Sequence, residues 1–185
     1  MSKVLAIDTS TSRSCVAIID GTDVLYSGFR DGATAHGPSL PALVQEALAV
    51  SDVDEVVVGM GPGPFTGLRV GIAFAQSFAL AREIPVRGVC SLDAIVCTAP
   101  EYVAATDARR KEIYWASYKD GKRVDGPHVN LPAEVEGKLF VGEGAHKYGL
   151  ADLATYPDVS VFAALPSVDQ PMYLRRPDAV PTSER

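Results

Sequence analysis

Apolar and polar residues alternate along the first half of the chain in a pattern typical of a sheet flanked by helices. Apolar runs bounded by turn residues predict five strands, at residues 3–7, 14–20, 23–29, 56–58 and 86–89. Apolar positions at helical spacing predict helices over residues 38–48 and 66–82, and a short one over 92–96. Three adjacent strands followed by alternating helices and strands indicate a mixed sheet covered by helices.

The second half of the chain repeats the order of the first. Residues 102–107 form an apolar run that ends in Asp107, as residues 4–8 end in Asp8. Further strands are predicted at residues 112–118, 123–129, 138–141 and 159–162. Because internal repetition indicates a duplicated architecture, we expect two tandem half-domains, the second abbreviated. The expected divisions are residues 1–98, residues 99–165 and an extended, proline-rich tail, 166–185, that lies over a surface.

Composition and charge exclude several classes of protein. The 185 residues are 47% hydrophobic and 22% charged, which is ordinary for a globular protein. The net charge is −6 and neither half is basic, so strong direct binding to nucleic acid is disfavoured. We expect no signal peptide, no membrane span and no membrane contact. Three cysteines without a CxxC motif predict a reducing, cytoplasmic location.

A glycine- and proline-rich loop, residues 59–64, precedes the helix predicted over 66–82. Such loops often hold phosphate, but this one lacks the Gly-Lys-Ser/Thr that positions it. Pro62 and Pro64 each remove a backbone N–H that a phosphate would need, and only Arg69 offers positive charge. We interpret the loop as a tight turn whose glycines let the helix pack closely.

The helix over 66–82 is apolar nearly all round, so it must be buried on more than one side. A stripe of small residues runs along it at i, i+4 spacing, next to a bulky stripe. The small residues are Gly67, Gly71, Ala75 and Ala79, and the bulky ones are Val70, Phe74 and Phe78. Two explanations stay open, namely packing within this chain and contact with a helix of a partner.

The sequence offers no motif for metal or nucleophilic chemistry. His36, His128 and His146 stand apart from one another, so no metal site is predicted. There is no G-x-S-x-G motif, and no cysteine lies beside a histidine. Cys15 and Cys90 fall in or at the end of predicted strands, where a buried and unreactive thiol is expected.

The duplicated unit, with a first strand ending in an Asp-Thr/Ser turn at residues 6–11, resembles the actin-like ATPase (ASKHA) fold. Sugar kinases, acetate kinases and Hsp70 share this fold, which consists of two RNase H-like halves. In it, the turn after the first strand holds a phosphate through backbone N–H groups and hydroxyls. The resemblance implies a vestigial nucleotide site formed by Asp8, Thr9, Ser10 and Asp107.

Three further segments narrow the resemblance, at residues 61–69, 107–114 and 171–175. They read GPGPFTGLR, DARRKEIY and PMYLR, and together they resemble the bacterial TsaB (YeaZ) family, paralogues of TsaD, over residues 3–176. The chain departs from that family at Pro64, where serine is usual, and in its short second half.

The resemblance implies a non-catalytic subunit of the complex that forms threonylcarbamoyladenosine next to the tRNA anticodon. The subunit would bind and activate a TsaD-type transferase through its first two helices, with a TsaE-type ATPase as a further partner and no cofactor. The resemblance also implies that this chain would contact tRNA only within the complex. The apolar helix faces allow two copies of the chain to form a homodimer when the partner is absent. The residues implied in partner binding are Leu40, Leu43, Val44, Gly67, Leu68, Val70, Gly71, Phe74, Ala75 and Phe78.

Two alternative functions and the role of one cluster of charged residues stay open. A small-molecule kinase of the same fold would use Asp8 and Asp107 around Mg-ATP. A peptidase would need a nucleophile or metal site that the sequence does not supply. The charged segment 107–112 is either a solvated hairpin or a contact with a partner protein or with tRNA in the assembled complex.

Overall fold

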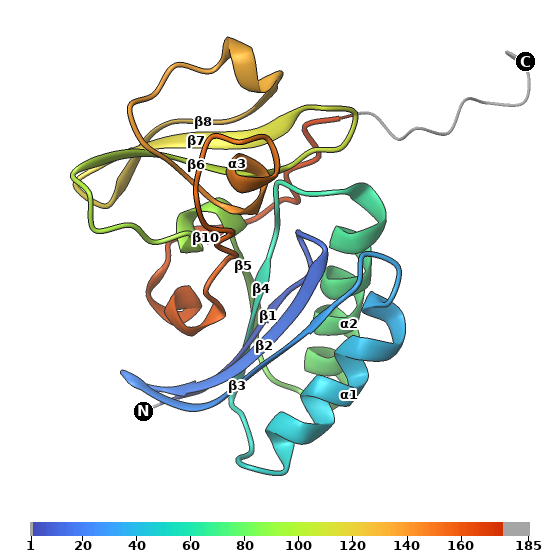
Figure 1. Ribbon diagram of the computed structural model, residues 1–185. Coiled ribbons are helices and arrows are strands. Elements are labelled where there is room, and N and C mark those ends of the chain that lie inside the picture. Colours follow the sequence, from blue (N-terminus) through green and yellow to red (C-terminus); the bar gives the residue numbers. More distant parts are fainter. Residues whose placement is uncertain (1, 176–185) are drawn as a thin grey trace, which may run out of the picture.

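The computed structural model describes residues 2–175 and contains two mixed sheets (Figure 1). The first has six strands in the order β10-β5-β4-β1-β2-β3. β1, β2 and β3 pair antiparallel, while β1, β4 and β5 pair parallel. The bounds are Lys3–Asp8 for β1, Arg13–Asp20 for β2, Asp23–Asp31 for β3, Glu55–Gly59 for β4, Val86–Val89 for β5 and Ser167–Val168 for β10.

Both faces of the first sheet are covered, which explains its uniformly apolar central strands. α1 (His36–Leu48) and α2 (Phe65–Arg82) lie side by side on one face. On β1, Leu5 and Ile7 face these helices, while Val4 and Ala6 face the other side. That other side is covered by η3 (Val159–Ala164), a 3-10 helix.

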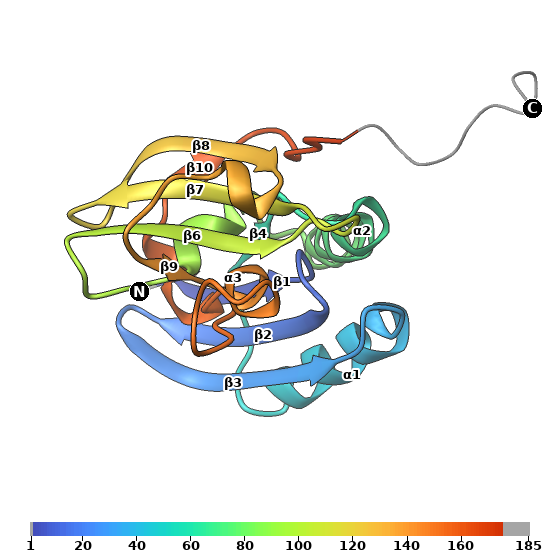
Figure 2. The same cartoon turned by 45° about the horizontal axis from the view of Figure 1, so that its top comes forward.

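The second sheet has four strands in the order β8-β7-β6-β9. Its bounds are Glu101–Asp107 for β6, Ile113–Lys119 for β7, Lys122–Asn130 for β8 and Phe140–Val141 for β9. α3 (Glu143–Lys147) follows β9 and packs on β6, as α2 follows β4 and packs on the first sheet, but α3 has 5 residues against 18 in α2. Two 3-10 turns, η1 (Ser91–Ala94) and η2 (Pro132–Glu134), complete the order. Figure 2 shows the second sheet beside the first lobe.

The strand predicted at residues 159–162 is wrong. This segment is the 3-10 helix η3, in which the Asp158 carboxylate accepts a hydrogen bond from the Ser160 N–H at 2.9 Å. Val159 and Phe162 are buried against the first sheet, so the alternation Val-Ser-Val-Phe reflects one buried face rather than a strand. The segment therefore belongs in space with the first lobe.

The segment after residue 166 closes the edge of the first sheet. Ser167 and Val168 pair antiparallel with β5, and the Met172 N–H donates to the Met60 carbonyl at 2.8 Å. The extended tail expected over residues 166–185 stays a prediction, because residues 176–185 lie outside the described part of the chain. Between residues 2 and 175, no helix is long and apolar enough to cross a membrane.

Candidate functional site

Asp8 lies at the end of β1, at the turn into β2. Its Oδ1 accepts hydrogen bonds from the Ser10 N–H at 2.9 Å and the Ser10 hydroxyl at 2.7 Å. Its Oδ2 accepts from the Ser91 hydroxyl at 2.6 Å. The side chain is 0% exposed, and this burial raises its pKa although the three hydrogen bonds act to lower it. Both oxygens of the Asp8 carboxylate thus accept hydrogen bonds from groups of the same chain.

The loop before α2 and the first turns of α2 lie directly on this turn. A Cβ at Gly63 would overlap the Ser10 carbonyl, one at Gly71 would overlap Thr9 Oγ1, and one at Gly67 would lie 2.8 Å from the Thr9 carbonyl. The Thr9 hydroxyl donates to the Gly67 carbonyl at 2.7 Å. These contacts agree with the interpretation of the loop as a structural turn. They leave no room for a side chain between Thr9 or Ser10 and these three glycines.

The small-residue stripe of α2 packs within the chain. Several residues expected at a partner interface are accordingly buried in the core of the first lobe, because helical spacing marks the face that meets the sheet. They are Leu40, Leu43, Val44, Gly67, Leu68, Gly71 and Ala75. Of the other three residues expected at the interface, Val70, Phe74 and Phe78 are half-buried, and partner contact by the ten residues stays a prediction.

The outward side of α1 and α2 is nearly free of charge. Among exposed residues of the two helices only Glu46, Arg69 and Arg82 are charged, and Glu46 and Arg82 pair with Arg30 and Asp52. We call the remaining exposed residues the outer helix face: Gly37, Pro38, Pro41, Ala42 and Gln45 of α1, with Thr66, Ala73, Gln76, Ser77, Leu80 and Ala81 of α2. Depletion of charge at the centre of a surface is typical of protein interfaces.

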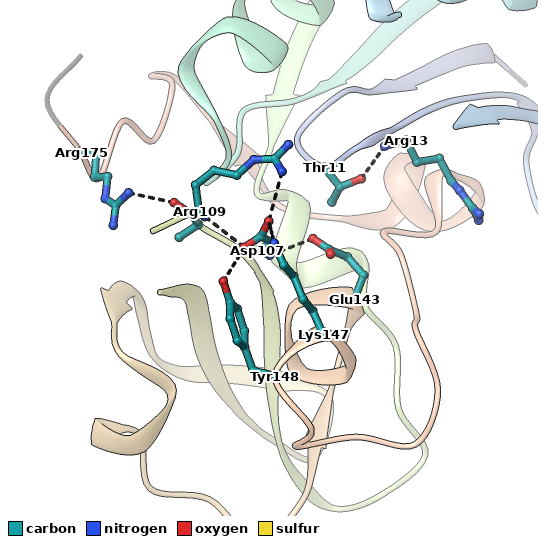
Figure 3. Close-up of polar contacts among 9 residues, drawn as sticks. Thr11, Arg13, Asp107, Arg109, Glu143, Lys147, Tyr148 and Arg175 are labelled. Carbon is teal, nitrogen blue, oxygen red and sulfur yellow. Dashed lines mark hydrogen bonds and ion pairs between the residues drawn. The ribbon is translucent and has the colours of Figure 1, made fainter. Parts of the chain in front are cut away.

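Asp107 ends β6 as Asp8 ends β1, but its partners differ (Figure 3). It accepts hydrogen bonds from Lys147 Nζ at 2.6 Å, the Tyr148 hydroxyl at 3.0 Å and the Arg109 N–H at 3.1 Å. Burial raises the pKa of Asp107, but these partners outweigh burial and hold the pKa below its ordinary value. The two aspartates therefore do not share one open site.

A small cavity lies between the two lobes beside Asp107. Its volume is about 130 Å³, and it is lined by Thr11, Ser12, Pro64, Asp107, Arg109, Glu143 and Lys147. Pockets that bury a small-molecule ligand usually measure about 300–1,000 Å³. The cavity is too small for a nucleotide.

Four of the residues around Asp8 and Asp107 were not anticipated from the sequence: Ser91, Glu143, Lys147 and Tyr148. Ser91 reaches Asp8 from 83 positions away, and nothing local marks it. Glu143, whose Oε1 accepts the Asp107 N–H at 2.8 Å, and Lys147 are four residues apart. That spacing places both side chains on one face of a helix, and it is the sequence feature from which their proximity could have been predicted.

The histidines and cysteines form no reactive group. Among residues 2–175, no three His, Cys, Asp or Glu side chains are placed to hold a metal ion. His36 is buried, and its Nδ1 lies 2.7 Å from the Ser14 hydroxyl. Burial raises the pKa of Cys90 to about 12 and also raises that of Cys15, so both thiols stay protonated.

Comparison with known proteins shows the family to which the chain belongs. Residues 31–166 match the family model described as TsaD, tRNA N6-adenosine threonylcarbamoyltransferase. The chain belongs to the TsaD/YeaZ family. An uncharacterised protein of Mycobacterium tuberculosis is 44% identical over 203 aligned positions, covering 98% of this chain and 95% of that protein. The tRNA threonylcarbamoyladenosine biosynthesis protein TsaB of Escherichia coli is 37% identical over 63% of this chain and 55% of its own length.

A solved structure, YeaZ from Pseudomonas aeruginosa, has a TM-score of 0.78 and 27% sequence identity, covering 94% of this chain and all of that one. The resemblance to the TsaB (YeaZ) family is thereby confirmed. The actin-like ATPase fold class is confirmed with it, as a mixed α/β fold with two mixed sheets.

Proposed function

We propose that this chain is a non-catalytic, cytoplasmic subunit of the complex that forms threonylcarbamoyladenosine next to the tRNA anticodon. The observation that carries the proposal is the closed turn at Asp8, whose oxygens are all engaged and whose surroundings are filled by glycines 63, 67 and 71. In the actin-like ATPase fold, the resemblance implies that this turn holds a phosphate, and here the Asp8 carboxylate is bound by Ser10 and Ser91 instead. The kinase alternative is disfavoured for the same reason, and by the size of the cavity beside Asp107.

The subunit acts through its surface rather than through a reaction centre. The outer helix face offers a TsaD-type paralogue an exposed area with few charges, so docking desolvates few ions. The half-buried rings of Phe74 and Phe78, 6.1 Å apart, lie at its edge. A TsaE-type ATPase would bind the assembled pair, and a second copy of this chain would occupy the face when the paralogue is absent.

Calorimetric titration of the chain with the TsaD-type paralogue of its own organism tests the proposal. The variant Ala42→Glu with Ala73→Glu adds a carboxylate to each exposed helix surface without touching the core. We expect its affinity to fall at least about tenfold, because unpaired carboxylates would be desolvated on docking. Ala154→Glu, at an exposed position of the loop before η3, is the matched control and should bind like the wild type. Equal affinities for all three proteins would contradict the proposed interface, and no binding by the wild type would contradict the proposed function.

A further inference from the structure

The 3-10 helix η1 lies in the connection between the two lobes, between their sheets (Figure 1). It follows β5 of the first sheet and precedes β6 of the second. Ser91, Leu92 and Ala94 are buried, and the Asp93 side chain is only 10% exposed. Buried polar side chains need hydrogen-bond partners, and Ser91 and Asp93 find theirs in different lobes.

Ser91 attaches η1 to the first lobe. Its hydroxyl donates to Asp8 Oδ2 at 2.6 Å and accepts the Gly61 N–H at 3.3 Å. Its own N–H donates to the Gly61 carbonyl at 2.8 Å. A Cβ at Gly59, the last residue of β4, would overlap both Asp8 Oδ2 and Ser91 Oγ, so glycine is required where these groups meet. Ser91 thus holds the end of β1 and the loop before α2 together.

Asp93 attaches η1 to the second lobe. Its Oδ1 accepts the Tyr118 hydroxyl at 2.7 Å and lies 3.3 Å from Arg123 Nε. Tyr118 and Arg123 are paired between β7 and β8, and the Tyr118 ring stacks on Tyr102 of β6 at a centroid distance of 4.9 Å. Leu92 packs in the same apolar cluster as the two tyrosines. We call Asp93, Tyr118 and Arg123 the interlobe network.

The interlobe network is shielded from water. Tyr118 is buried and the Arg123 side chain is 24% exposed. Burial raises the pKa of Tyr118, so its hydroxyl keeps its proton and stays a donor. A hydrogen bond to a shielded carboxylate is stronger than one in water, and loss of one partner leaves the other unsatisfied. The network therefore fixes the position of η1 against the second sheet.

We infer that the interlobe network positions Ser91, so that the second lobe sets the geometry of the Asp8 turn and of the loop before α2. Ser91 and Asp93 belong to one tight turn, in which the Asp93 N–H donates to the Cys90 carbonyl at 3.1 Å. A displacement of one side chain therefore displaces the other. Tyr118 and Arg123 are positioning residues for a contact that lies in the other lobe.

Tyr118→Phe tests this role, because it removes one hydroxyl and leaves the ring and the charge of Asp93 in place. Ser91→Ala gives the reference response. The Ser91 hydrogen bond acts to lower the pKa of Asp8, so its removal should raise that pKa further. A displaced Ser91 in Tyr118→Phe should raise the pKa of Asp8 in the same direction.

Tyr148→Phe is the matched control. The Tyr148 hydroxyl also donates to an aspartate of the second lobe, Asp107, which is not part of η1. The control therefore loses the same chemical group and the same kind of hydrogen bond. It should leave Asp8 and Ser91 as they are in the wild type.

Two measurements on the intact chain separate positioning from stability. NMR of the Asp8 carboxyl carbon follows its pKa, and amide hydrogen exchange compares Gly61 and Ser91 with the amides of β1. We expect Tyr118→Phe to raise the pKa of Asp8 and to accelerate exchange at Gly61 and Ser91 about fivefold or more relative to β1, the effect of about one lost hydrogen bond. Tyr148→Phe should change neither quantity.

Arg123→Gln is a second variant, which loses the contact with Asp93 at a partly exposed position. It is followed by exchange alone, because loss of a charge can itself alter the pKa of Asp8. Lys122→Gln, at the exposed neighbouring position, removes the same charge and serves as its control. If Tyr118→Phe does not fold, this pair decides by the same comparison, with faster exchange at Gly61 and Ser91 expected in Arg123→Gln only.

Three results would overturn the inference. The first is an Asp8 pKa in Tyr118→Phe equal to that of the wild type. The second is acceleration at Gly61 and Ser91 no greater than in β1, which would make the interlobe network a general contribution to stability. The third is the same response in either control variant, which would show that the effect does not pass through Asp93.

Discussion

Asp8 and Asp107 occupy matching positions at the ends of β1 and β6, yet their surroundings shift their pKa values in opposite directions. Asp8 is held by serine hydroxyls and one N–H in a fully buried place, and its pKa is raised mainly by burial. Asp107 has Lys147 among its partners, and its pKa is lowered despite burial. The sequence repeat predicted the matching positions, but the partners come from residues 2 to 83 positions away.

The raised pKa of Asp8 predicts a specific pH dependence. The folded state holds this proton more tightly than the unfolded state, so ionisation of Asp8 lowers the free energy of unfolding as the pH rises above 3.8 towards the raised pKa and through it. Asp8→Asn cannot ionise, and its stability relative to the wild type should increase from pH 4 to pH 8 in urea unfolding. A difference that is the same at both pH values would contradict a raised pKa. Asp8→Ala, which leaves buried donors of Ser10 and Ser91 without an acceptor, should lose about 2 kcal/mol or more.

Asp107→Asn should show the opposite dependence. The lowered pKa means that the carboxylate stabilises the fold above pH 3.8, and that this contribution is lost as the pH falls through the folded pKa. Because Lys147 is 46% exposed, solvent screens the pair, and we expect a loss of only about 1 kcal/mol at pH 7. Urea unfolding of the wild type and of Asp107→Asn, at pH 7 and in acid, measures the loss of stability at each pH. A loss that persists undiminished in acid would point to packing rather than charge.

Among the elements, those with one strong local pattern were predicted well and those defined by distant contacts were not. Five of the six strands of the first sheet and α2 follow from apolar runs and helical spacing, whereas the two-residue β10 was not predicted. η3 was mistaken for a strand because its alternation imitates one, and only the cover it gives to the far face of the first sheet reveals its role. For α2, spacing identified the buried stripe correctly but left open what buries it: Gly67 and Gly71 pack on the Asp8 turn, and Ala75 and Ala79 pack in the core of the first lobe.

The contact between α2 and that turn can be tested at Gly71. Alanine favours helix by about 1 kcal/mol, but its Cβ would overlap Thr9 Oγ1, so we expect Gly71→Ala to lower the free energy of unfolding by about 1–3 kcal/mol. Thr9→Ala removes that oxygen and leaves Thr9 Cβ 3.4 Å from the new methyl group. The double variant should therefore be more stable than the sum of the single effects, by about 0.5 kcal/mol or more.

Gly37→Ala provides the control for this cycle. A Cβ at Gly37 in α1 meets nothing within 4 Å, so alanine there should be neutral or stabilising. Additive effects of Gly71→Ala and Thr9→Ala in chemical unfolding would contradict the close packing that closes the turn.

At the scale of the whole molecule, the two lobes retain the duplicated plan, and the cavity between them beside Asp107 measures about 130 Å³. The second lobe keeps its three antiparallel strands but has the 5-residue α3 after β9, where the first lobe has the 18-residue α2 after β4. The charged turn between β6 and β7 lies over the N-terminal end of α2, which carries part of the outer helix face. The repeat, the short second lobe and the charged turn were visible in the sequence. Their meeting at one end of α2 was not, because it depends on how the lobes and the segment 171–175 pack together.

The most direct test of this account is the threonylcarbamoyladenosine content of total tRNA, measured by mass spectrometry in cells depleted of the chain and complemented with variants. We expect Asp8→Asn and the control Ala154→Glu to restore the modified nucleoside, and Ala42→Glu with Ala73→Glu to fail although the protein accumulates. That result would place the function on the outer helix face and not in the Asp8 turn. Loss of modification in Asp8→Asn, with full restoration by the helix-face variant, would contradict the account and favour chemistry at Asp8.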